Sequence, residues 1–394
     1  MPRRLRKSEL PTWNIPLSDI DYGQEEAEAV ERVLRSKWLS MGPEVEKFEA
    51  DFAALMGTKH AIAVSSATAA LHLALLAVGV SPGSEVIQPA LNFVASANMT
   101  VACGARPVFA DVISLTEPTI DPVQVARLIT PRTKALIVMH YGGNLCRMAD
   151  LYELCKGRSI FLIEDACHAV GTRYHGNRQQ IPDGMMAGAI GDIGCFSFFS
   201  NKNMATGEGG MLVTQNDDVA NNVRLLRSHG MTSLTWQRHS GHARNYEVAI
   251  NGYNYRLDEI RAALGRVQLT KLGANNEIRR QLLHCYKRAI DHMGGWGMPF
   301  STSIEQSAAH LMVGIAPATG TRDQAVEQLR EAGIQSSLHY PCIADFKAFT
   351  NGTERQHLPI TREFVTRAVT LPLYPTMSVR NVDTVCQVVG KSAA

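Results

Sequence analysis

The chain has 394 residues, of which 45% are hydrophobic and 19% are charged. This length exceeds what a single hydrophobic core normally supports, so two domains are expected. The formal net charge of +2 provides no strong field for nucleic acid or for an anionic membrane surface, so neither is an expected partner.

The first residues and the cysteines indicate a cytoplasmic protein. The basic cluster Met1–Lys7 is followed by Ser8, Glu9 and Pro11, where a signal peptide would need an apolar stretch. No apolar run reaches the length of a membrane span. The eight cysteines are scattered without a Cys-x-x-Cys pair, which is typical of reduced thiols rather than of disulfides or zinc ligands. We therefore expect no metal site.

The first two thirds of the chain alternate between helical and strand patterns. Two amphipathic helices, Glu25–Leu34 and Glu44–Met56, come first. Helices such as Thr68–Ala77 and Val123–Leu128 then separate a series of apolar strands. The strands are expected at Ala61–Ser65, Glu85–Gln88, Pro107–Asp111, Ala135–His140, Ile160–Glu164, Cys195–Phe199 and Met211–Thr214. Nearly continuous apolar strands between helices predict an α/β fold with a mainly parallel sheet covered on both faces. Ligands of such sheets bind at the carboxyl ends of the strands.

The pattern changes near Leu257. A long helical run continues through Arg279 to Ile290 and leads into shorter units. These units are His310–Ile315, a helix at Arg322–Ala332, Ile334–His339 and a last helix near Arg380–Val389. We expect a large domain over residues 1–256 and a small α/β domain over residues 257–394, which begins with the long linking helix.

Two charged residues near strand ends indicate a cofactor. Asp165 ends a buried strand, and Lys202 lies on a loop between an aromatic strand and a Gly-Glu-Gly-Gly turn. Pyridoxal phosphate needs a carboxylate that keeps its pyridine nitrogen protonated and a lysine that forms a Schiff base. Desolvation would give the lysine amine the neutral fraction that this reaction requires. Taken singly, the carboxylate is as well explained by a helix cap and the lysine by a solvated loop, but their order and apolar flanks favour the cofactor.

Further residues suit the cofactor's phosphate and ring. The segment Ser65–Leu71 passes from a strand into a helix through small hydroxyl residues, and its free N–H groups and positive dipole end suit an anion. An ordinary N-cap by Ser66 or Thr68 explains the same residues. Ser197 could donate to the same phosphate, and Phe93 could stack on the pyridine ring or belong to the core.

The segment Leu234–Arg244 mixes aromatic, guanidinium and imidazole groups, among them Trp236, Arg238 and His239. Such groups suit a sugar linked to a diphosphate, because rings and bases stack on aromatic side chains and phosphates pair with cations. A structured dimer loop with Trp236 as an interface anchor is the alternative interpretation, and the two are compatible.

From about Ser40 to Pro375 the chain resembles the DegT/StrS family of pyridoxal-phosphate-dependent sugar aminotransferases. The matching segments are weak singly but specific as an ordered series: residues 42–49, 65–75, 83–93, 104–111, 129–135, 164–171, 196–210 and 252–256. The resemblance implies the type I aminotransferase fold, similar to aspartate aminotransferase, with a mainly parallel sheet in the large domain and a small α/β domain at the C-terminus.

The resemblance also implies roles for single positions. Lys202 matches the Schiff-base lysine, Asp165 the partner of the pyridine nitrogen, and Phe93 the aromatic side chain that stacks on the ring. His168 stands where members carry Gln or His near the cofactor's phenolic oxygen, although a satisfied strand-end histidine fits the position too. Phosphate contacts are implied for Ala67, Thr68, Ser197 and, from the neighbouring subunit of a homodimer with shared sites, Asn254. We assign substrate contacts to Trp236, Arg238, His239, Tyr255, Arg256 and His339.

The activity that the resemblance implies is a ping-pong transfer of an amino group from L-glutamate to a keto sugar nucleotide, with pyridoxamine phosphate between the two halves. Ala67 replaces a glycine of many members, as in relatives that aminate the C4 position, so we expect a 4-keto-6-deoxy sugar on dTDP or UDP, in amino sugar or antibiotic biosynthesis. The alternatives are a 3-keto position, a keto-cyclitol of the scyllo-inosose type, and a regulatory protein that binds the cofactor without turnover. Lys202 argues against a sugar 3-dehydratase, because those relatives carry histidine there.

Overall fold

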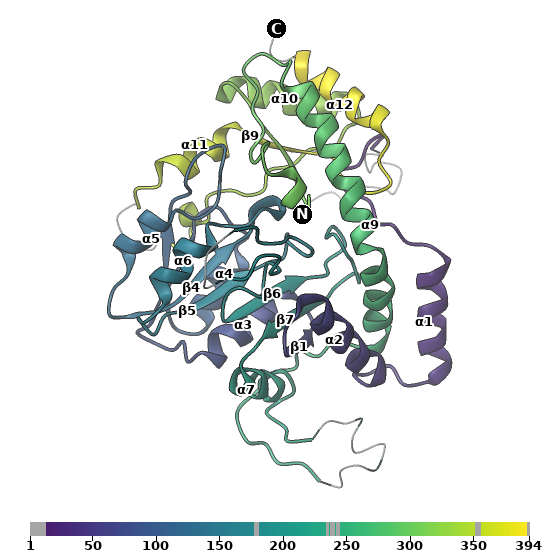
Figure 1. Cartoon of the computed structure of the whole chain (residues 1–394), viewed down its shortest axis with the longest axis vertical. Helices are drawn as coiled ribbons and strands as arrows, with labels where there is room; N and C mark the ends of the chain where they lie inside the picture. Colours follow the sequence, from purple (N-terminus) through teal and green to yellow (C-terminus); the bar gives the residue numbers. More distant parts are fainter. Residues whose placement is uncertain are drawn as a thin grey trace, which may run out of the picture.

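The computed structural model describes residues 13–176, 181–233, 236, 241, 245–350 and 356–391. A seven-stranded sheet forms the centre of the larger part of the molecule (Figure 1). Its strands are β1 (His60–Val64), β2 (Glu85–Pro89), β3 (Arg106–Ala110), β4 (Thr133–Met139), β5 (Phe161–Asp165), β6 (Ile193–Ser197) and β7 (Gly210–Thr214). Their order across the sheet is β1-β7-β6-β5-β4-β2-β3.

The sheet is mainly parallel, as the sequence predicts. Strands β3, β2, β4, β5 and β6 pair in parallel, whereas β7 is antiparallel to both β1 and β6. The expected strand Cys195–Phe199 is misplaced at its end, because pairing between β6 and β7 stops at Ser197 opposite Gly210. Beyond that pair, the Phe198 N–H donates to the Gly209 carbonyl and the chain turns into the loop that carries Lys202.

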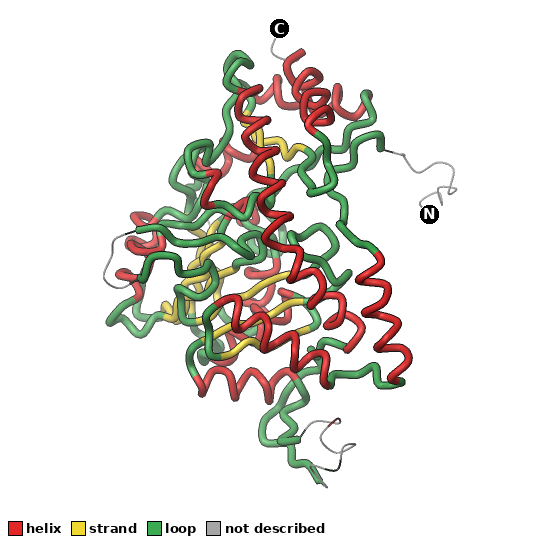
Figure 2. Tube along the Cα trace, turned by 45° about the vertical axis from the view of Figure 1, so that its right-hand side comes forward, coloured by secondary structure: helices red, strands yellow, loops and turns green. Residues whose placement is uncertain are grey.

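Alternate strand residues enter two separate hydrophobic layers, as the period of two in a strand requires. In β1, Ile62 and Val64 pack with α3 (Ala67–Ala77), while Ala61 and Ala63 pack with α2 (Pro43–Met56) on the opposite face. Figure 2 shows helices on both sides of the sheet. The remaining helices of this part are α1 (Gln24–Ser36), α4 (Ala95–Ala102), α5 (Pro122–Leu128), α6 (Met148–Cys155) and α7 (Asp217–Arg227).

The long helix α9 (Glu259–Ile290) connects the two parts of the chain. It contacts α1 and α2 beside the large sheet and α12 (Val379–Gly390) at the other end (Figure 1). The C-terminal part contains α10 (Thr319–Glu331), α11 (Pro359–Arg367) and an antiparallel pair, β8 (Met312–Ile315) with β9 (Ala368–Leu371). It has its own hydrophobic core, built around Tyr286, Leu329 and Val382. The domain limits 1–256 and 257–394 stay a prediction, and they place the start of the small domain two residues before α9.

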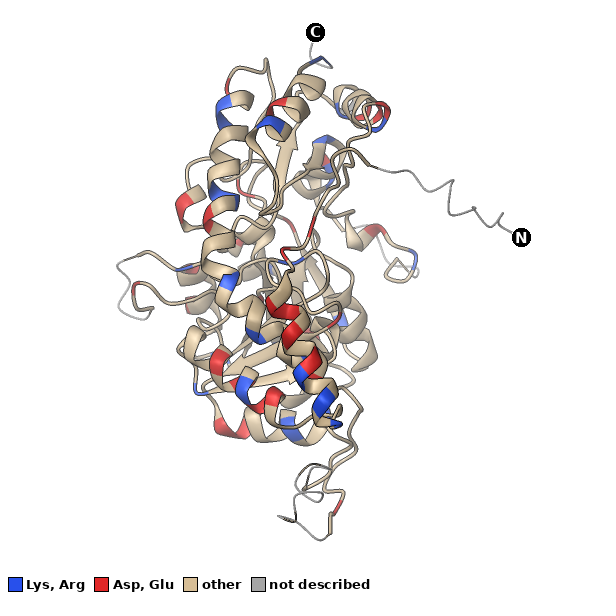
Figure 3. Ribbon diagram, turned by 90° about the vertical axis from the view of Figure 1, so that its right-hand side faces the viewer, with Lys and Arg blue, Asp and Glu red and all other residues tan. Residues whose placement is uncertain are grey.

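Charge on α1 follows the helix dipole. Figure 3 shows acidic residues toward the start of this helix and basic residues toward its end. Glu25 and Glu26 lie in the first turn and Arg35 in the last, which favours the helix because its N-terminus carries a partial positive charge. Among the described residues, every helix is too short or too polar to cross a membrane.

Candidate active site

A cavity of about 370 Å³ opens at the carboxyl ends of β5 and β6. This is where ligands bind in mainly parallel sheets. Residues from three places line it: the large sheet, the C-terminal part, and the turn Ser66–Thr68 at the start of α3, which we call the α3 turn. The predicted residues that line it are Ala67, Thr68, Phe93, Asp165, His168, Ser197, Lys202 and His339.

Asp165 and its neighbour Glu164 occupy opposite faces of the end of β5, because successive strand residues alternate. Glu164 is fully buried and accepts hydrogen bonds from the backbone N–H groups of Gly188, Ile190 and Gly191 at 2.5–2.7 Å. It is also hydrogen-bonded to His140 Nε2 at 2.8 Å. With its oxygens used in this way, Glu164 holds the strand end in place. Asp165 is the carboxylate that faces the cavity.

Lys202 lies on a short, well-bonded loop that begins directly after β6. Its N–H donates to the Phe199 carbonyl at 2.9 Å, and the Thr206 N–H donates to the Phe198 carbonyl at 2.8 Å. Burial lowers the pKa of the Lys202 amine below its usual value, and the nearby Cys167 and Asp165 oppose this shift only in part. A lowered pKa supplies the neutral amine that a Schiff base requires.

The α3 turn combines the two interpretations that the sequence left open, an ordinary N-cap and a helix N-terminus that suits an anion. Ser66 is the N-cap, because its hydroxyl accepts from the Ala69 N–H at 3.1 Å. Ala67 and Thr68 occupy the first helical turn, whose N–H groups have no partner within a helix, and both residues line the cavity. Gly210, the first residue of β7, lies directly against the α3 turn, because a Cβ added to it would be 2.5 Å from the Ser66 carbonyl carbon. The turn therefore caps the helix and also directs a helix N-terminus at the cavity.

Aromatic and imidazole rings also line the cavity, from Phe93, His168, His339 and Tyr340. His168 is hydrogen-bonded through Nε2 to the Tyr340 hydroxyl at 2.8 Å, and the Phe93 and Tyr340 rings lie 5.8 Å apart. His339 is hydrogen-bonded to Thr370 at 3.1 Å. Burial, together with the nearby Lys202 charge, lowers the pKa of His339 to about 4, so this imidazole is neutral at physiological pH. Sequence analysis missed Tyr340, which reaches the cavity from the C-terminal part and carries no local motif.

The other predicted site residues lie outside the lining of this cavity. Asn254 is exposed and forms a bridge with Ser228. The Tyr255 hydroxyl is hydrogen-bonded to His72 at 3.1 Å, while burial and the nearby Arg227 lower the pKa of Arg256. Arg238 and His239 lie outside the described residues.

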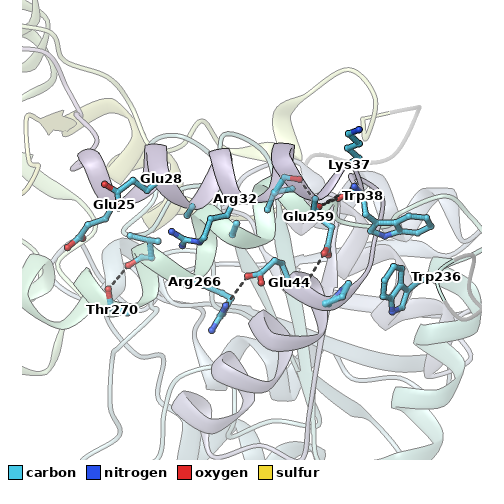
Figure 4. Close-up of a pocket in the computed structure, with 16 residues that line it drawn as sticks. Glu25, Glu28, Arg32, Lys37, Trp38, Glu44, Trp236, Glu259, Arg266 and Thr270 are labelled. Carbon is cyan, nitrogen blue, oxygen red and sulfur yellow. Dashed lines mark hydrogen bonds and ion pairs between the residues drawn. The ribbon is translucent and has the colours of Figure 1, made fainter. Parts of the chain in front are cut away.

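Trp236 lies at one end of a larger groove, of about 1020 Å³, between α1 and α9 (Figure 4). Its ring centroid is 4.9 Å from that of Trp38. Glu25 and Glu28 line the other end, and Arg32 and Arg266 lie between the two ends (Figure 4). Lys202 and Asp165, the two predicted catalytic residues, line the smaller cavity and not this groove. Within the described part of the chain, no group of three or more His, Cys, Asp or Glu residues is placed to hold a metal ion.

Comparison with known proteins identifies the family. The DegT/DnrJ/EryC1/StrS aminotransferase family matches residues 21–390. The chain belongs to this family. Over 384 residues it is 39% identical to the spore coat polysaccharide biosynthesis protein SpsC of Bacillus subtilis, covering 96% of this chain and 95% of SpsC.

Solved structures of this aminotransferase family share the fold. The putative sugar aminotransferase Spr1654 from Streptococcus pneumoniae, in its PMP form, superimposes with a TM-score of 0.88 at 26% identity, over 96% of this chain and 99% of that one. DesI, solved in the presence of its TDP-sugar product, gives a TM-score of 0.83 at 27% identity, over 97% and 92%. These matches confirm the predicted fold class, a pyridoxal-phosphate-dependent sugar aminotransferase activity, and the cofactor.

The residues present fit pyridoxal phosphate. Asp165 and Lys202 supply the carboxylate and the amine, and the α3 turn presents backbone N–H groups for a phosphate. Buried polar atoms without a hydrogen-bond partner, His168 Nδ1 and Asn201 Oδ1, belong to residues that line the same cavity. Such atoms are costly unless a ligand or water satisfies them.

Proposed function

We propose that this aminotransferase moves the amino group of L-glutamate to a 4-keto-6-deoxy sugar carried on dTDP or UDP, in two half-reactions with ping-pong kinetics. Family membership together with the cavity containing Lys202 and Asp165 supports the transfer. The TDP-sugar product of DesI supports a nucleotide-linked acceptor. The choice of a 4-keto acceptor rests on Ala67, which relatives that aminate the C4 position share, and the choice of L-glutamate as donor rests on the family resemblance.

Each cavity residue has a role in this proposal. Pyridoxal phosphate, when bound, supplies an aldehyde that takes up the amino group and a protonated ring that withdraws electrons from the reacting carbon. Asp165 keeps that ring nitrogen protonated. Lys202 would hold the cofactor covalently, and its free amine would take the proton from the donor's α-carbon. Ala67, Thr68 and Ser197 would hold the phosphate, Phe93 would stack on the ring, and His168 would bind near its phenolic oxygen.

A homodimer with shared sites forms part of the proposal. Phe93 and Phe199 line the cavity and are 55% and 44% exposed. Tyr246, Val248 and Ile250, on the segment that precedes Asn254, are also exposed. A second copy that covered these side chains would remove apolar area from water and would bring its Asn254 toward the phosphate turn. The assigned substrate contacts of Trp236, Arg238, His239, Tyr255, Arg256 and His339 belong to the same proposal.

The decisive experiment is a screen of amino acceptors with L-glutamate as donor, in which formation of 2-oxoglutarate is measured. We expect turnover with a nucleotide-linked 4-keto sugar and little with 3-keto sugars or free inososes. Turnover with a 3-keto sugar or an inosose alone would replace the proposed acceptor by that compound. Binding of pyridoxal phosphate without turnover of any acceptor or donor would favour the regulatory alternative, and Lys202→Ala is the inactive control.

A further inference from the structure

Asn203, the residue next to Lys202, is buried, with 6% of its surface exposed, and its side-chain amide is fully engaged. Its Nδ2 donates to Asn276 Oδ1 at 2.7 Å and to the Ala308 carbonyl at 2.6 Å. Its Oδ1 is hydrogen-bonded to His310 Nδ1 at 2.8 Å. Two distant segments, α9 and residues 308–310, therefore meet at one side chain beside Lys202.

Backbone carbonyls fix the orientation of both amides. A carbonyl oxygen can only accept, so the amide nitrogen of Asn203 must face Ala308. In the same way, Asn276 Nδ2 donates to the Val170 carbonyl at 2.9 Å, which leaves its Oδ1 to accept from Asn203. The oxygen of Asn203 consequently faces His310.

This orientation determines the tautomer of His310. Because Asn203 Oδ1 is an acceptor, His310 Nδ1 must carry the proton and donate it. Burial, together with the nearby His168 and Lys202, lowers the pKa of His310 well below its usual value, so the ring is neutral and its Nε2 bears a lone pair. The His310 ring contacts the ring of His168, which lines the cavity, with centroids 4.3 Å apart and planes tilted by 35°.

The three partners lie at the junction between the large sheet and the C-terminal part. Asn276 lies within α9, the helix that spans both parts, and Ala308 and His310 directly precede β8. The 308–310 segment is itself tied to the large part, since the Ala308 N–H donates to Thr172 Oγ1 at 2.9 Å and the His310 N–H to the Gly142 carbonyl at 3.0 Å. Through Asn203, the Lys202 loop is thus hydrogen-bonded to α9 and to a segment that is itself hydrogen-bonded to the large part.

We propose that Asn203 and His310 are positioning residues, which fix the Lys202 loop to α9 and to the 308–310 segment so that the lysine nitrogen stays desolvated and aligned in the cavity. The inference rests on the proposed function, in which Lys202 acts both as anchor and as base. A loop held only by its backbone turn would let the amine reach water, where its protonated form is favoured. Neither residue touches the substrate in this assignment.

The test compares two substitutions at position 310 in the full-length holoenzyme. His310→Leu keeps an apolar shape but removes the donor to Asn203 Oδ1, whereas His310→Asn places an amide N–H where the imidazole Nδ1–H was. His284→Leu is the matched control, because His284 lies on α9 with its side chain 38% exposed and is hydrogen-bonded to Glu305 at 2.6 Å. Three quantities are measured: the pH titration of the visible absorbance of the lysine-bound cofactor, the single-turnover rate with L-glutamate, and the affinity for pyridoxamine phosphate, which needs no bond to Lys202.

For His310→Leu we expect the titration midpoint to move upward and the single-turnover rate to fall about tenfold, which corresponds to about 1.4 kcal/mol of barrier. The affinity for pyridoxamine phosphate should stay within about twofold, because Asp165 and the α3 turn are unchanged. His310→Asn should restore most of the loss, and His284→Leu should behave as the unmodified enzyme. An unchanged titration and rate in His310→Leu would overturn the proposal, as would equal losses in the Leu and Asn variants.

If His310→Leu yields no folded protein, Asn276→Ala is measured in its place, since it removes the acceptor on α9 from the same amide. An unchanged titration in that variant overturns the proposal in the same way. Failure of the proposed function has a different signature, because the unmodified protein would then show no lysine-bound cofactor and no turnover.

Discussion

At the scale of single residues, the Lys202 amine is the group on which the assigned chemistry depends most. Lys202→Ala should reduce transamination to the level without enzyme, because in the proposed function this side chain is both the covalent anchor and the proton carrier. Lys202→Arg should be equally inactive, since a guanidinium stays protonated and cannot form the imine. The measurement is 2-oxoglutarate formation from L-glutamate, with thermal unfolding as the control for folding. Turnover by either variant would show that another amine carries the cofactor.

Asp165→Asn tests a different property of the site. The amide is nearly isosteric, so the cofactor should still bind, but the ring nitrogen loses its counter-charge. We expect the rate to fall by several orders of magnitude, each tenfold being about 1.4 kcal/mol of barrier. Glu164 cannot replace the lost carboxylate, because it lies on the opposite face of β5 and is held by three backbone N–H groups. Near-normal rates in stopped-flow experiments would assign the ring nitrogen to another acid.

Sequence reasoning distinguished some of these residues and missed others. Asp165 and Lys202 stand beside apolar strands, which makes their burial readable from local pattern. Tyr340 and His310 reach the site from segments more than a hundred residues downstream of Lys202, and their positions depend on how the C-terminal part packs. The Asn203 network was equally hidden, because an asparagine in a polar loop gives no sign of three distant partners.

At the scale of elements, the close approach of β7 to the α3 turn predicts that the proposed phosphate site does not tolerate a side chain at Gly210. A Cβ on Gly210 would lie 2.5 Å from the Ser66 carbonyl carbon and 2.7 Å from the Ala67 nitrogen, and backbone atoms cannot rotate away. Gly210→Ala should therefore displace the turn and weaken pyridoxamine phosphate binding by tenfold or more. Gly273→Ala is the control, because open space surrounds that position in α9; it should bind normally and gain up to about 1 kcal/mol of stability. Equal affinities in the two variants, measured by equilibrium dialysis, would contradict the assigned phosphate site.

The start of β2, a strand that lies between β4 and β3, carries a pH-dependent cluster of hydrogen bonds. Glu85, on β2, accepts hydrogen bonds from Arg106, Arg132 and Thr130, each at 2.7 Å. Burial opposes its ionised form, but these hydrogen bonds outweigh burial and lower the pKa of Glu85 to about 2. Because the folded pKa lies below the unfolded one, this stabilisation is present above about pH 4.5 and is lost as pH falls toward 2.

Glu85→Gln should accordingly lower the free energy of unfolding near neutral pH and flatten its decline between pH 4.5 and about 2. Urea unfolding at a series of pH values measures both effects. Glu46→Gln, on the exposed side of α2, is the control for loss of a surface carboxylate and should change the curve far less than Glu85→Gln does. A pH dependence in Glu85→Gln identical to that of the unmodified protein would show that this carboxylate is not the group that titrates.

Elements with a clear local pattern were predicted from the sequence, and elements that depend on tertiary packing were not. Strands such as β4 and β5 are continuous apolar runs buried on both faces, so their pattern is sufficient for prediction. The helix α4 is built from small and polar residues without an apolar period, and it is buried by tertiary packing between α3 and β3. β9 has four residues and is defined by its pairing with β8, a partner more than fifty residues away. Local pattern carries no such information.

At the scale of the whole molecule, the proposed sharing of active sites explains why Asn254 lies outside the cavity of its own chain. Asn254 is exposed and paired through its backbone with Ser228, while the phosphate turn it is assigned to contact is Ala67–Thr68 of a second copy. In a two-fold dimer each subunit would complete the site of the other, since an isologous interface uses the same surface twice. Loss of Asn254 and loss of Lys202 would then damage different sites of a mixed dimer.

Mixed dimers of an Asn254→Ala chain and a Lys202→Ala chain therefore provide the test. One site would combine an intact Lys202 with an intact Asn254, and the other would contain both lesions. Purification through two different affinity tags isolates the heterodimer, and its activity should approach half that of the unmodified dimer, although each homodimeric variant is defective. If Asn254→Ala is defective alone and the heterodimer shows no recovery, Asn254 acts within its own subunit. If Asn254→Ala alone is fully active, this asparagine contributes nothing essential to phosphate binding, and the shared site would have to be built from other residues.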